Sequence, residues 1–369
     1  MGGEYAQAGV DYSKIEPFKR AMVEVGKRTL YFPNARDVYI DEEALGTHGV
    51  IYSYRGPHSP MWCKTQEGLG NKNWIAEWMY QYSGTGKTYY DGIGIDTALM
   101  AANDVICQGA LPIVYTDEVA AGDSEWFQDE RRAEDLAKSF YQACEMCGMA
   151  LPAGESPALR YLVKAEPPVE SAPSLSGCVT GIIAPNSRKT TGEKLSVGDR
   201  IIGATSSGLH ANGISLVIRR AKTLKDEFLH VLPNGHTLGE EALIPTRCYV
   251  QLVEALLEEE IDIHALLAGT GGGVSKIAYD KRAFTYRVKH WVEPPVLFQF
   301  MREIGVSLED CLNTFNWGIG FYIFVPEAEV DRTLKIGKST GYELLYLGEV
   351  ERGERQVIFE PEKMTLPPI

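Results

Sequence analysis

The sequence predicts an α/β (α+β) protein of two domains, each a mixed sheet with helices packed on it. The chain has 369 residues, which is long for one hydrophobic core. Strand-like and helix-like segments alternate in both halves. Residues 185–198 are polar, contain Gly192 and lack apolar periodicity, as expected of a domain junction. We therefore predict an N-terminal domain over residues 1–185 and a C-terminal domain over residues 186–369.

The individual elements follow from apolar spacing and from capping residues. In the first half these are a helix near 16–28, strands near 61–65 and 113–115, a helix starting at Asp96 or Thr97, a helix capped by Asp123 and Ser124, and a strand over 177–184. In the second half they are strands near 200–205, 261–267 and 319–325, helices after residue 216, near Ser275 and near 328–337, and two final strands.

Composition excludes several classes of protein. The net charge of −14 argues against nucleic-acid binding, which depends on Lys and Arg facing phosphates. No apolar run reaches the roughly 18 residues that a membrane helix needs. The N-terminus lacks the basic and apolar regions of a secretory signal. The seven cysteines are odd in number and scattered, which is typical of reduced thiols. We expect a cytoplasmic protein without membrane or nucleic-acid partners.

A first candidate for phosphate binding is the segment Glu67-Gly68-Leu69-Gly70-Asn71-Lys72 after a predicted strand. Glycines let backbone N–H groups approach phosphate oxygens, Lys offsets their charge, and a carboxylate can hold Mg²⁺. The alternative is a tight turn with solvated charges.

Asp96 and Asp104, with Asn103 beside the latter, are candidates for metal and nucleotide contacts. Eight helical residues span about 12 Å, so two carboxylates in one regular helix cannot bind one ion. Either Asp96 precedes the helix or two ions are involved. The alternatives are an N-cap for Asp96 and a solvated helix face for Asp104.

Further candidates are Glu155, in an apolar turn after a glycine, and His210, in a turn of small polar residues that includes Ser207 and Asn212. The run Gly269-Thr270-Gly271-Gly272-Gly273, between a strand and a predicted helix, is an arrangement that places an anion at a helix N-terminus. The alternatives are a capping carboxylate for Glu155, a structural role for His210, and, for the glycine run, a tight connection without ligand.

The order of these motifs is more specific than any one of them. The segments AGVDYSKIEPFK, LGTHGV, EGLGNK, GIGIDTALMAANDVICQGALP, AGES, SSGLHANGISL, GTGGG and TFNWGIG follow one another along the chain. In this order, from about residue 8 to residue 325, the sequence resembles the aminoimidazole ribonucleotide synthetase (phosphoribosylformylglycinamidine cyclo-ligase) family.

The resemblance implies a two-domain ATP-binding fold whose N-terminal domains pair in a homodimer. It implies a phosphoribosyl small-molecule substrate, with ATP and Mg²⁺ as cofactors. The implied site residues are, for metal, Glu67, Asp96 and Asp104; for ATP, Gly46, His48, Gly68, Gly70, Lys72, Asn103 and Asp104; for substrate, Ser207, His210, Asn212, Thr270, Gly271 and Gly272; and for catalysis, His210, Lys72 and Glu155.

The implied reaction phosphorylates the formamide oxygen of formylglycinamidine ribonucleotide. The amidine nitrogen then closes the imidazole ring, and ADP and phosphate leave. Three positions depart from the family pattern: Glu67 replaces an aspartate, Ala268 a histidine, and Ser156 begins a changed segment. The alternatives are a related ATP-dependent kinase or dehydratase acting on another small molecule, and a non-catalytic nucleotide-binding dimer.

Overall fold

The computed structural model describes residues 4–44 and 49–368, so Gly46 and His48 lie outside the described residues. The chain forms two compact units. The first contains the chain up to residue 105 together with 111–186, and the second contains 106–110 together with 187–369. Each unit has a main sheet of its own, as predicted for a two-domain α/β protein, and the first unit also contains a two-stranded sheet of β1 (Val38–Ile40) and β2 (Tyr52–Tyr54).

The sheet of the first unit has four strands in the order β3-β6-β4-β5. They are β3 (Met61–Gly68), β6 (Ser174–Ile183), β4 (Leu111–Ala120) and β5 (Ala150–Glu155). The pair β4 and β5 is parallel, whereas the other two pairs are antiparallel. The sheet is therefore mixed, and β3 and β5 are its edges.

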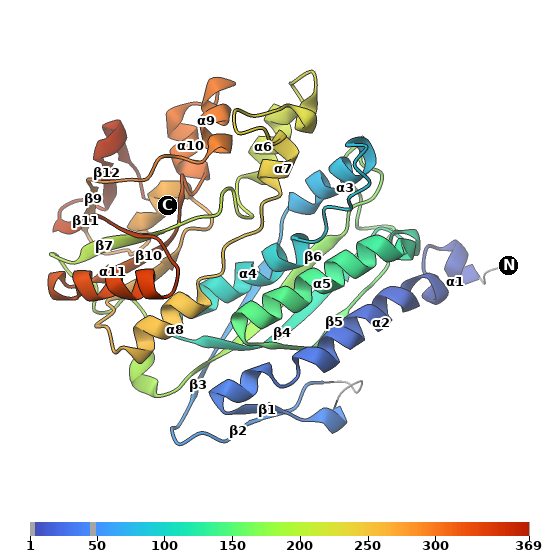
Figure 1. The fold of residues 1–369 in the computed structure, drawn as a ribbon, viewed down its shortest axis with the longest axis horizontal. Helices are drawn as coiled ribbons and strands as arrows, with labels where there is room; N and C mark the ends of the chain where they lie inside the picture. The colour runs from blue at the N-terminus through green and yellow to red at the C-terminus, as the bar shows by residue number, and fades with distance from the viewer. Residues whose placement is uncertain (1–3, 45–48, 369) are drawn as a thin grey trace. The chain divides into compact units, whose positions relative to one another are not determined.

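Three long helices cover one face of this sheet (Figure 1): α2 (Tyr12–Thr29), α4 (Ile93–Val105) and α5 (Glu130–Cys147). Alternate residues of β4 are buried beneath them, while Thr116 and Glu118 on the other face are more exposed. The sheet thus has one face covered by helices, and residues of β1 and β2 pack against Val114 and Ile182 on its other face.

Several predicted boundaries are wrong by a few residues. Strand β3 continues through Glu67 and Gly68, so the candidate phosphate motif begins inside the strand. Helix α4 begins at Ile93, which places Asp96 in its first turn rather than at its cap. The helix predicted to be capped by Asp123 is divided in two. Asp123 caps a short 3₁₀ helix, η4 (Ser124–Gln128), and Asp129 caps the longer helix α5.

The second unit contains a seven-stranded mixed sheet in the order β13-β12-β9-β11-β7-β10-β8. In chain order the strands are β7 (Arg200–Thr205), β8 (Ala265–Ala268), β9 (Phe284–Val288), β10 (Ile319–Val325), β11 (Leu344–Arg352), β12 (Gln356–Phe359) and β13 (Met364–Leu366). Every residue of β10 is buried. Three strands, rather than the two predicted, end the chain.

Helices and short 3₁₀ segments surround this second sheet. The α-helices are α6 (Ile214–Ala221), α7 (Leu238–Ala242), α8 (Val250–Glu258), α9 (Val296–Glu303), α10 (Leu308–Thr314) and α11 (Val330–Ser339). The helix predicted near Ser275 is a 3₁₀ helix, η7 (Gly273–Ala278).

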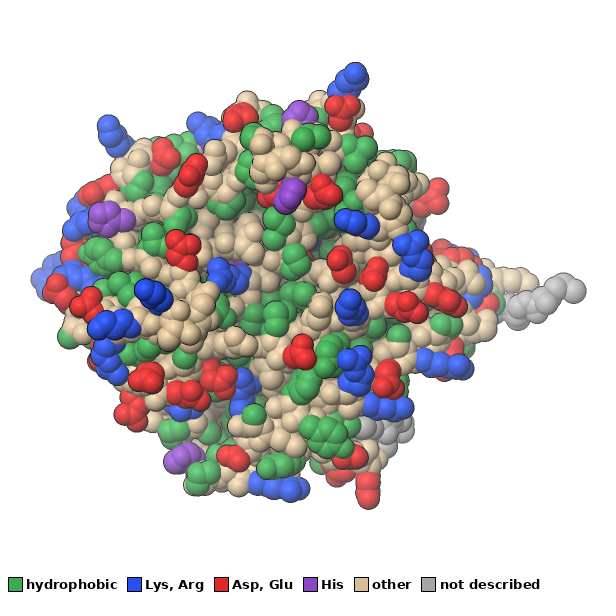
Figure 2. All heavy atoms as spheres, viewed as in Figure 1, with side chains coloured by type: hydrophobic (Ala, Val, Ile, Leu, Met, Phe, Trp, Pro, Cys, Tyr) green, Lys and Arg blue, Asp and Glu red, His purple; other side chains and the backbone are tan. Residues whose placement is uncertain are grey.

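The surface is of mixed charge. On the face shown in Figure 2, Lys and Arg side chains are interspersed with Asp and Glu side chains. Within the described ranges, no helix has both the length and the apolar character needed to cross a membrane.

Candidate functional site

Several predicted residues of the first unit meet at one end of its sheet. Strand register pairs Glu67 with Gly177, Gly177 with Asp117, and Asp117 with Gly154. The next level along the strands holds Gly68, Ser176, Glu118 and Glu155. The predicted residues 67, 68 and 155, far apart in sequence, therefore lie on two levels at the same end of this sheet.

Lys72, which begins α3 (Lys72–Tyr82), forms a buried ion pair with Asp96. Its Nζ atom lies 2.9 Å from Oδ1 and 2.8 Å from Oδ2 of that carboxylate, and neither side chain has exposed surface. Burial lowers the pKa of Lys72, and the neighbouring charge of Asp96 opposes that shift. The pair anchors the segment after β3 to helix α4.

The residues predicted to hold Mg²⁺ do not assemble into one site. Asp96 and Asp104 both lie inside α4, eight residues or about 12 Å apart. Asp96 is fully buried against Lys72, whereas Glu67 and Asp104 are partly exposed. Among residues 4–44 and 49–368, no three His, Cys, Asp or Glu side chains are grouped closely enough to hold a metal ion. Asp96 and Asp104 therefore cannot hold one ion together, and the assignment of these carboxylates to Mg²⁺ stays a prediction.

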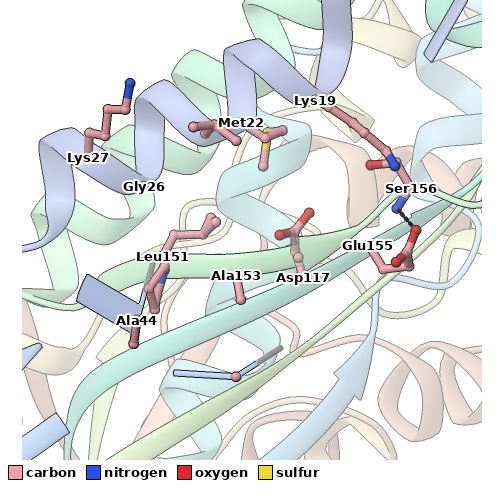
Figure 3. A pocket seen from close by; sticks show the side chains of 14 residues that line it. Lys19, Met22, Gly26, Lys27, Ala44, Asp117, Leu151, Ala153, Glu155 and Ser156 are labelled. Carbon is pink, nitrogen blue, oxygen red and sulfur yellow. Dashed lines mark hydrogen bonds between the residues drawn. The ribbon is translucent and has the colours of Figure 1, made fainter. Parts of the chain in front are cut away.

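A cavity of about 550 Å³ lies on the helix-covered side of this sheet, at the edge formed by β5 (Figure 3). Its volume is within the range of small-molecule sites. Helix α2 and the ends of β4 and β5 form most of its wall. The lining residues include Lys19, Met22, Val23, Asp117, Leu151 and Gly154.

Asp117 is the most unusual group in this cavity. It is 7% exposed, and its buried Oδ1 atom has no hydrogen-bond partner in the described structure. Burial raises the pKa of Asp117 to about 7, against a hydrogen bond from its own backbone, and the charges of Glu155 and Glu118 add to the rise. Sequence analysis missed this residue, although a carboxylate within a buried strand is a signal that could have identified it.

Gly154 provides the space that Asp117 occupies. A Cβ atom at residue 154 would lie 2.0 Å from Oδ1 of Asp117, so a larger residue cannot be accommodated without moving that carboxyl. The neighbouring Glu155 is exposed, and its Oε1 accepts a hydrogen bond of 2.9 Å from the backbone N–H of Ser156. Glu155 thus lies at the rim of the cavity, whereas Asp117 is buried inside it.

In the second unit, His210 is buried within its own loop. It is 1% exposed, and its Nε2 atom lies 3.3 Å from the backbone N of Ser207 and 3.5 Å from that of Arg247. Both neighbours are N–H donors, so Nε2 is the acceptor and Nδ1 carries the proton in the neutral ring. Ser207 in turn donates its hydroxyl to the carbonyl of Pro245 at 2.6 Å.

Asn316, in the TFNWGIG segment, holds this loop in place. Its Nδ2 atom donates to the carbonyl of Gly208 at 2.8 Å, and its Oδ1 atom accepts from the backbone N–H of Gly318 at 2.9 Å. In the sequence this segment counted only as one of the ordered motifs that carry the family resemblance. The structure shows that its buried amide joins two motifs more than 100 residues apart.

The predicted substrate segments of the second unit are close to one another. A Cβ atom at Gly271 would lie 3.9 Å from Oδ1 of Asn212. The Nδ2 atom of Asn212 is buried and has no hydrogen-bond partner among the described residues. Thr270 is buried, and its carbonyl accepts a hydrogen bond from Lys276. Because η7 is a six-residue 3₁₀ helix, the predicted anion site at a helix N-terminus is not supported.

Several solved structures share this fold. Hydrogenase maturation protein HypE in complex with ATP matches with a TM-score of 0.58 and 17% identity, covering 89% of this chain and 90% of that one. Thiamine-monophosphate kinase from Stenotrophomonas maltophilia matches with a TM-score of 0.56 and 16% identity, covering 92% and 96%. At these identities the similarity establishes the fold alone.

Relatives found by sequence similarity indicate the family as well as the fold. The family domains described as AIR synthase related protein, N-terminal and C-terminal, match residues 77–183 and 196–360. A phosphoribosylformylglycinamidine cyclo-ligase from Pyrococcus horikoshii is 32% identical over 98% of this chain and 97% of its own length. One from Caldanaerobacter subterraneus is 30% identical over 96% and 99%. The chain therefore belongs to the AIR synthase-related family that includes the phosphoribosylformylglycinamidine cyclo-ligases.

Proposed function

We propose that this protein catalyses the ATP-dependent ring closure of formylglycinamidine ribonucleotide to aminoimidazole ribonucleotide in purine biosynthesis. The observation that carries the proposal is the identity of 30 to 32% to relatives named for this cyclo-ligase over nearly the whole of both chains. The two groups of site residues, one in each unit, support it.

The first unit supplies the nucleotide side of the proposed site. Gly68 and Gly70 are exposed at the end of β3, where their backbone can approach phosphate oxygens. Lys72 has no exposed surface, so we assign it the role of fixing this segment through Asp96. Glu155 lies at the same end of the sheet.

The second unit supplies the substrate side. Asn212 and Gly271 are neighbours, and the buried Nδ2 atom of Asn212 is a donor suited to an oxygen of the ribonucleotide. We propose that the protonated Nδ1 atom of His210 serves the proton transfers of ring closure. The proposed reaction forms one C–N bond, and the phosphorylated oxygen leaves as phosphate.

We expect substrate-dependent phosphate release when the purified protein is mixed with MgATP and formylglycinamidine ribonucleotide. One aminoimidazole product should form for each phosphate. Phosphate release without that product would replace this proposal with a kinase or dehydratase acting on another acceptor. Nucleotide binding without turnover would contradict this proposal and indicate a non-catalytic nucleotide-binding protein.

We further propose a cytoplasmic homodimer that pairs through the face of the first sheet opposite its helices. Trp62, on edge strand β3, is 46% exposed, and Met61 beside it is 40% exposed. Large apolar side chains on an edge strand favour pairing with a second copy.

We therefore expect Trp62→Glu to shift the protein from dimer to monomer, measured as molar mass by light scattering during size-exclusion chromatography. Tyr161→Glu is the matched control, because Tyr161 is 85% exposed and lies outside the sheet. An unchanged dimer in Trp62→Glu would contradict this interface.

A further inference from the structure

The loop that carries His210 has a backbone conformation that few residues adopt by themselves. His210 has a φ of +59°, and Gly208, two residues earlier, has a φ of +141°. A left-handed conformation is unfavourable for a residue with a side chain, and it persists only where the surrounding structure fixes it. Because His210 is 1% exposed, the groups that fix it are protein groups.

The side-chain amide of Asn316 supplies most of the hydrogen bonds that hold this loop. Its Nδ2 atom donates to the carbonyls of Gly208 at 2.8 Å and Leu209 at 3.4 Å. Its Oδ1 atom accepts from the backbone N–H of Gly318 at 2.9 Å and from the hydroxyl of Ser206 at 3.1 Å. An amide has two N–H donors and an oxygen with two lone pairs, so these bonds use its whole capacity. Three of the four partners belong to the loop, directly before its histidine.

The backbone of β10 determines how deep the imidazole ring lies. A Cβ atom at Gly320 would lie 2.6 Å from Cε1 of His210 and 2.1 Å from the hydroxyl oxygen of Tyr249. The ring therefore packs directly on the strand that follows Asn316, and a side chain at residue 320 would displace it. Tyr249 is itself fixed, because its hydroxyl donates to the carbonyl of Thr205 at 2.9 Å.

We propose that Asn316 is a positioning residue for the ring closure: its amide acts through the backbone of residues 206–209 to hold the imidazole of His210 in place for proton transfer. The inference rests on the proposed function and on the role given there to His210. Asn316 is buried and bonds to other protein groups, so it acts through His210 rather than on the substrate. Displacing a catalytic group by about 1 Å can cost about 100-fold in rate.

A double-mutant cycle tests the dependence on His210. Values of kcat and KM are measured with MgATP and formylglycinamidine ribonucleotide for the wild type, Asn316→Ala, His210→Gln and the double variant. Asn316→Ala should lower kcat about 100-fold and leave the KM for ATP within about twofold of the wild-type value. In the His210→Gln background the same change should lower kcat no more than about threefold, because residues that act as a unit are not additive.

Ser206→Ala provides a milder perturbation that leaves the rest of the amide bonded. It removes one of the four hydrogen bonds of Asn316 and should lower kcat about fivefold, again only where His210 is present. Asn316→Asp keeps the shape of the side chain but turns an oxygen toward the carbonyls of Gly208 and Leu209. It should be as slow as Asn316→Ala, because neither carbonyl can donate.

Thr333→Val is the matched control for the loss of a buried hydrogen bond elsewhere in the second unit. Thr333 lies in α11 with no exposed surface, and its hydroxyl donates to the carbonyl of Glu329 at 2.8 Å. The variant should lower the melting temperature but keep kcat within about twofold of the wild-type value. All rates are measured well below the melting temperature of each variant.

NMR spectroscopy reports the position of the ring without turnover. In ¹H–¹³C spectra of the histidine side chains, the Cε1–Hε1 signal of His210 is the one that His210→Gln lacks. This signal should move in Asn316→Ala and stay unchanged in Thr333→Val.

Equal effects of Asn316→Ala in the two backgrounds, or an unmoved His210 signal, would overturn the positioning role and leave the proposed function intact. An absence of aminoimidazole product with the wild type would overturn the proposed function, and the role of Asn316 in ring closure with it.

Discussion

Replacing Lys72 with Met is expected to lower the free energy of unfolding by about 3–5 kcal/mol. Lys72 and Asp96 have no exposed surface, and they face each other at 2.8 to 2.9 Å. Methionine fills a similar volume but leaves the Asp96 carboxylate buried without a counter-charge, which is far more costly than loss of an exposed pair. Urea denaturation followed by circular dichroism measures the difference.

An exposed Lys–Asp pair in the same chain is the matched control. Lys194 and Asp262 lie 2.6 Å apart, but their side chains are 63% and 48% exposed, so Lys194→Met should cost no more than about 1 kcal/mol. The double variant Lys72→Met, Asp96→Leu removes both charges and should recover most of the lost stability. Equal effects of Lys72→Met and Lys194→Met would contradict the buried pair.

Replacing His210 with Ala is expected to lower kcat by about 10²-fold or more, because general acid–base groups typically contribute that much. The same change also removes the acceptor for the backbone N–H groups of Ser207 and Arg247. The loss of kcat therefore combines a loss of proton transfer with a disturbance of the loop. Steady-state kinetics of product formation measure the total effect.

His210→Gln separates the two contributions. Its side-chain carbonyl can accept from the same N–H groups, but an amide does not exchange protons at neutral pH. If His210 moves a proton, His210→Gln should recover the melting temperature of the wild type while kcat stays about 10²-fold low. Recovery of both quantities would instead assign His210 the role of holding the loop.

Local patterns were sufficient for most of the elements. The apolar run that predicts a strand at 319–325 coincides with β10, because every side chain there is buried and turn residues bound it on both sides. The predicted start of α4, at Asp96 or Thr97, is three or four residues too late. Gly94 lies inside the helix, where a Cβ atom would come within 2.6 Å of the backbone N of Phe140 on α5. That close approach is a tertiary requirement that local propensity does not record.

The fold class, the order of the motifs and the family to which they point could all be predicted from the amino-acid sequence. These depend on residue type and on spacing along the chain. Which charges are buried together became clear from the three-dimensional structure. It pairs Lys72 with Asp96, separates Asp96 from Asp104 along one helix, and places the buried Oδ1 atom of Asp117 at the wall of a cavity. The physical reason is that burial and pairing depend on strand register and helix packing, which bring together residues that lie far apart in the sequence.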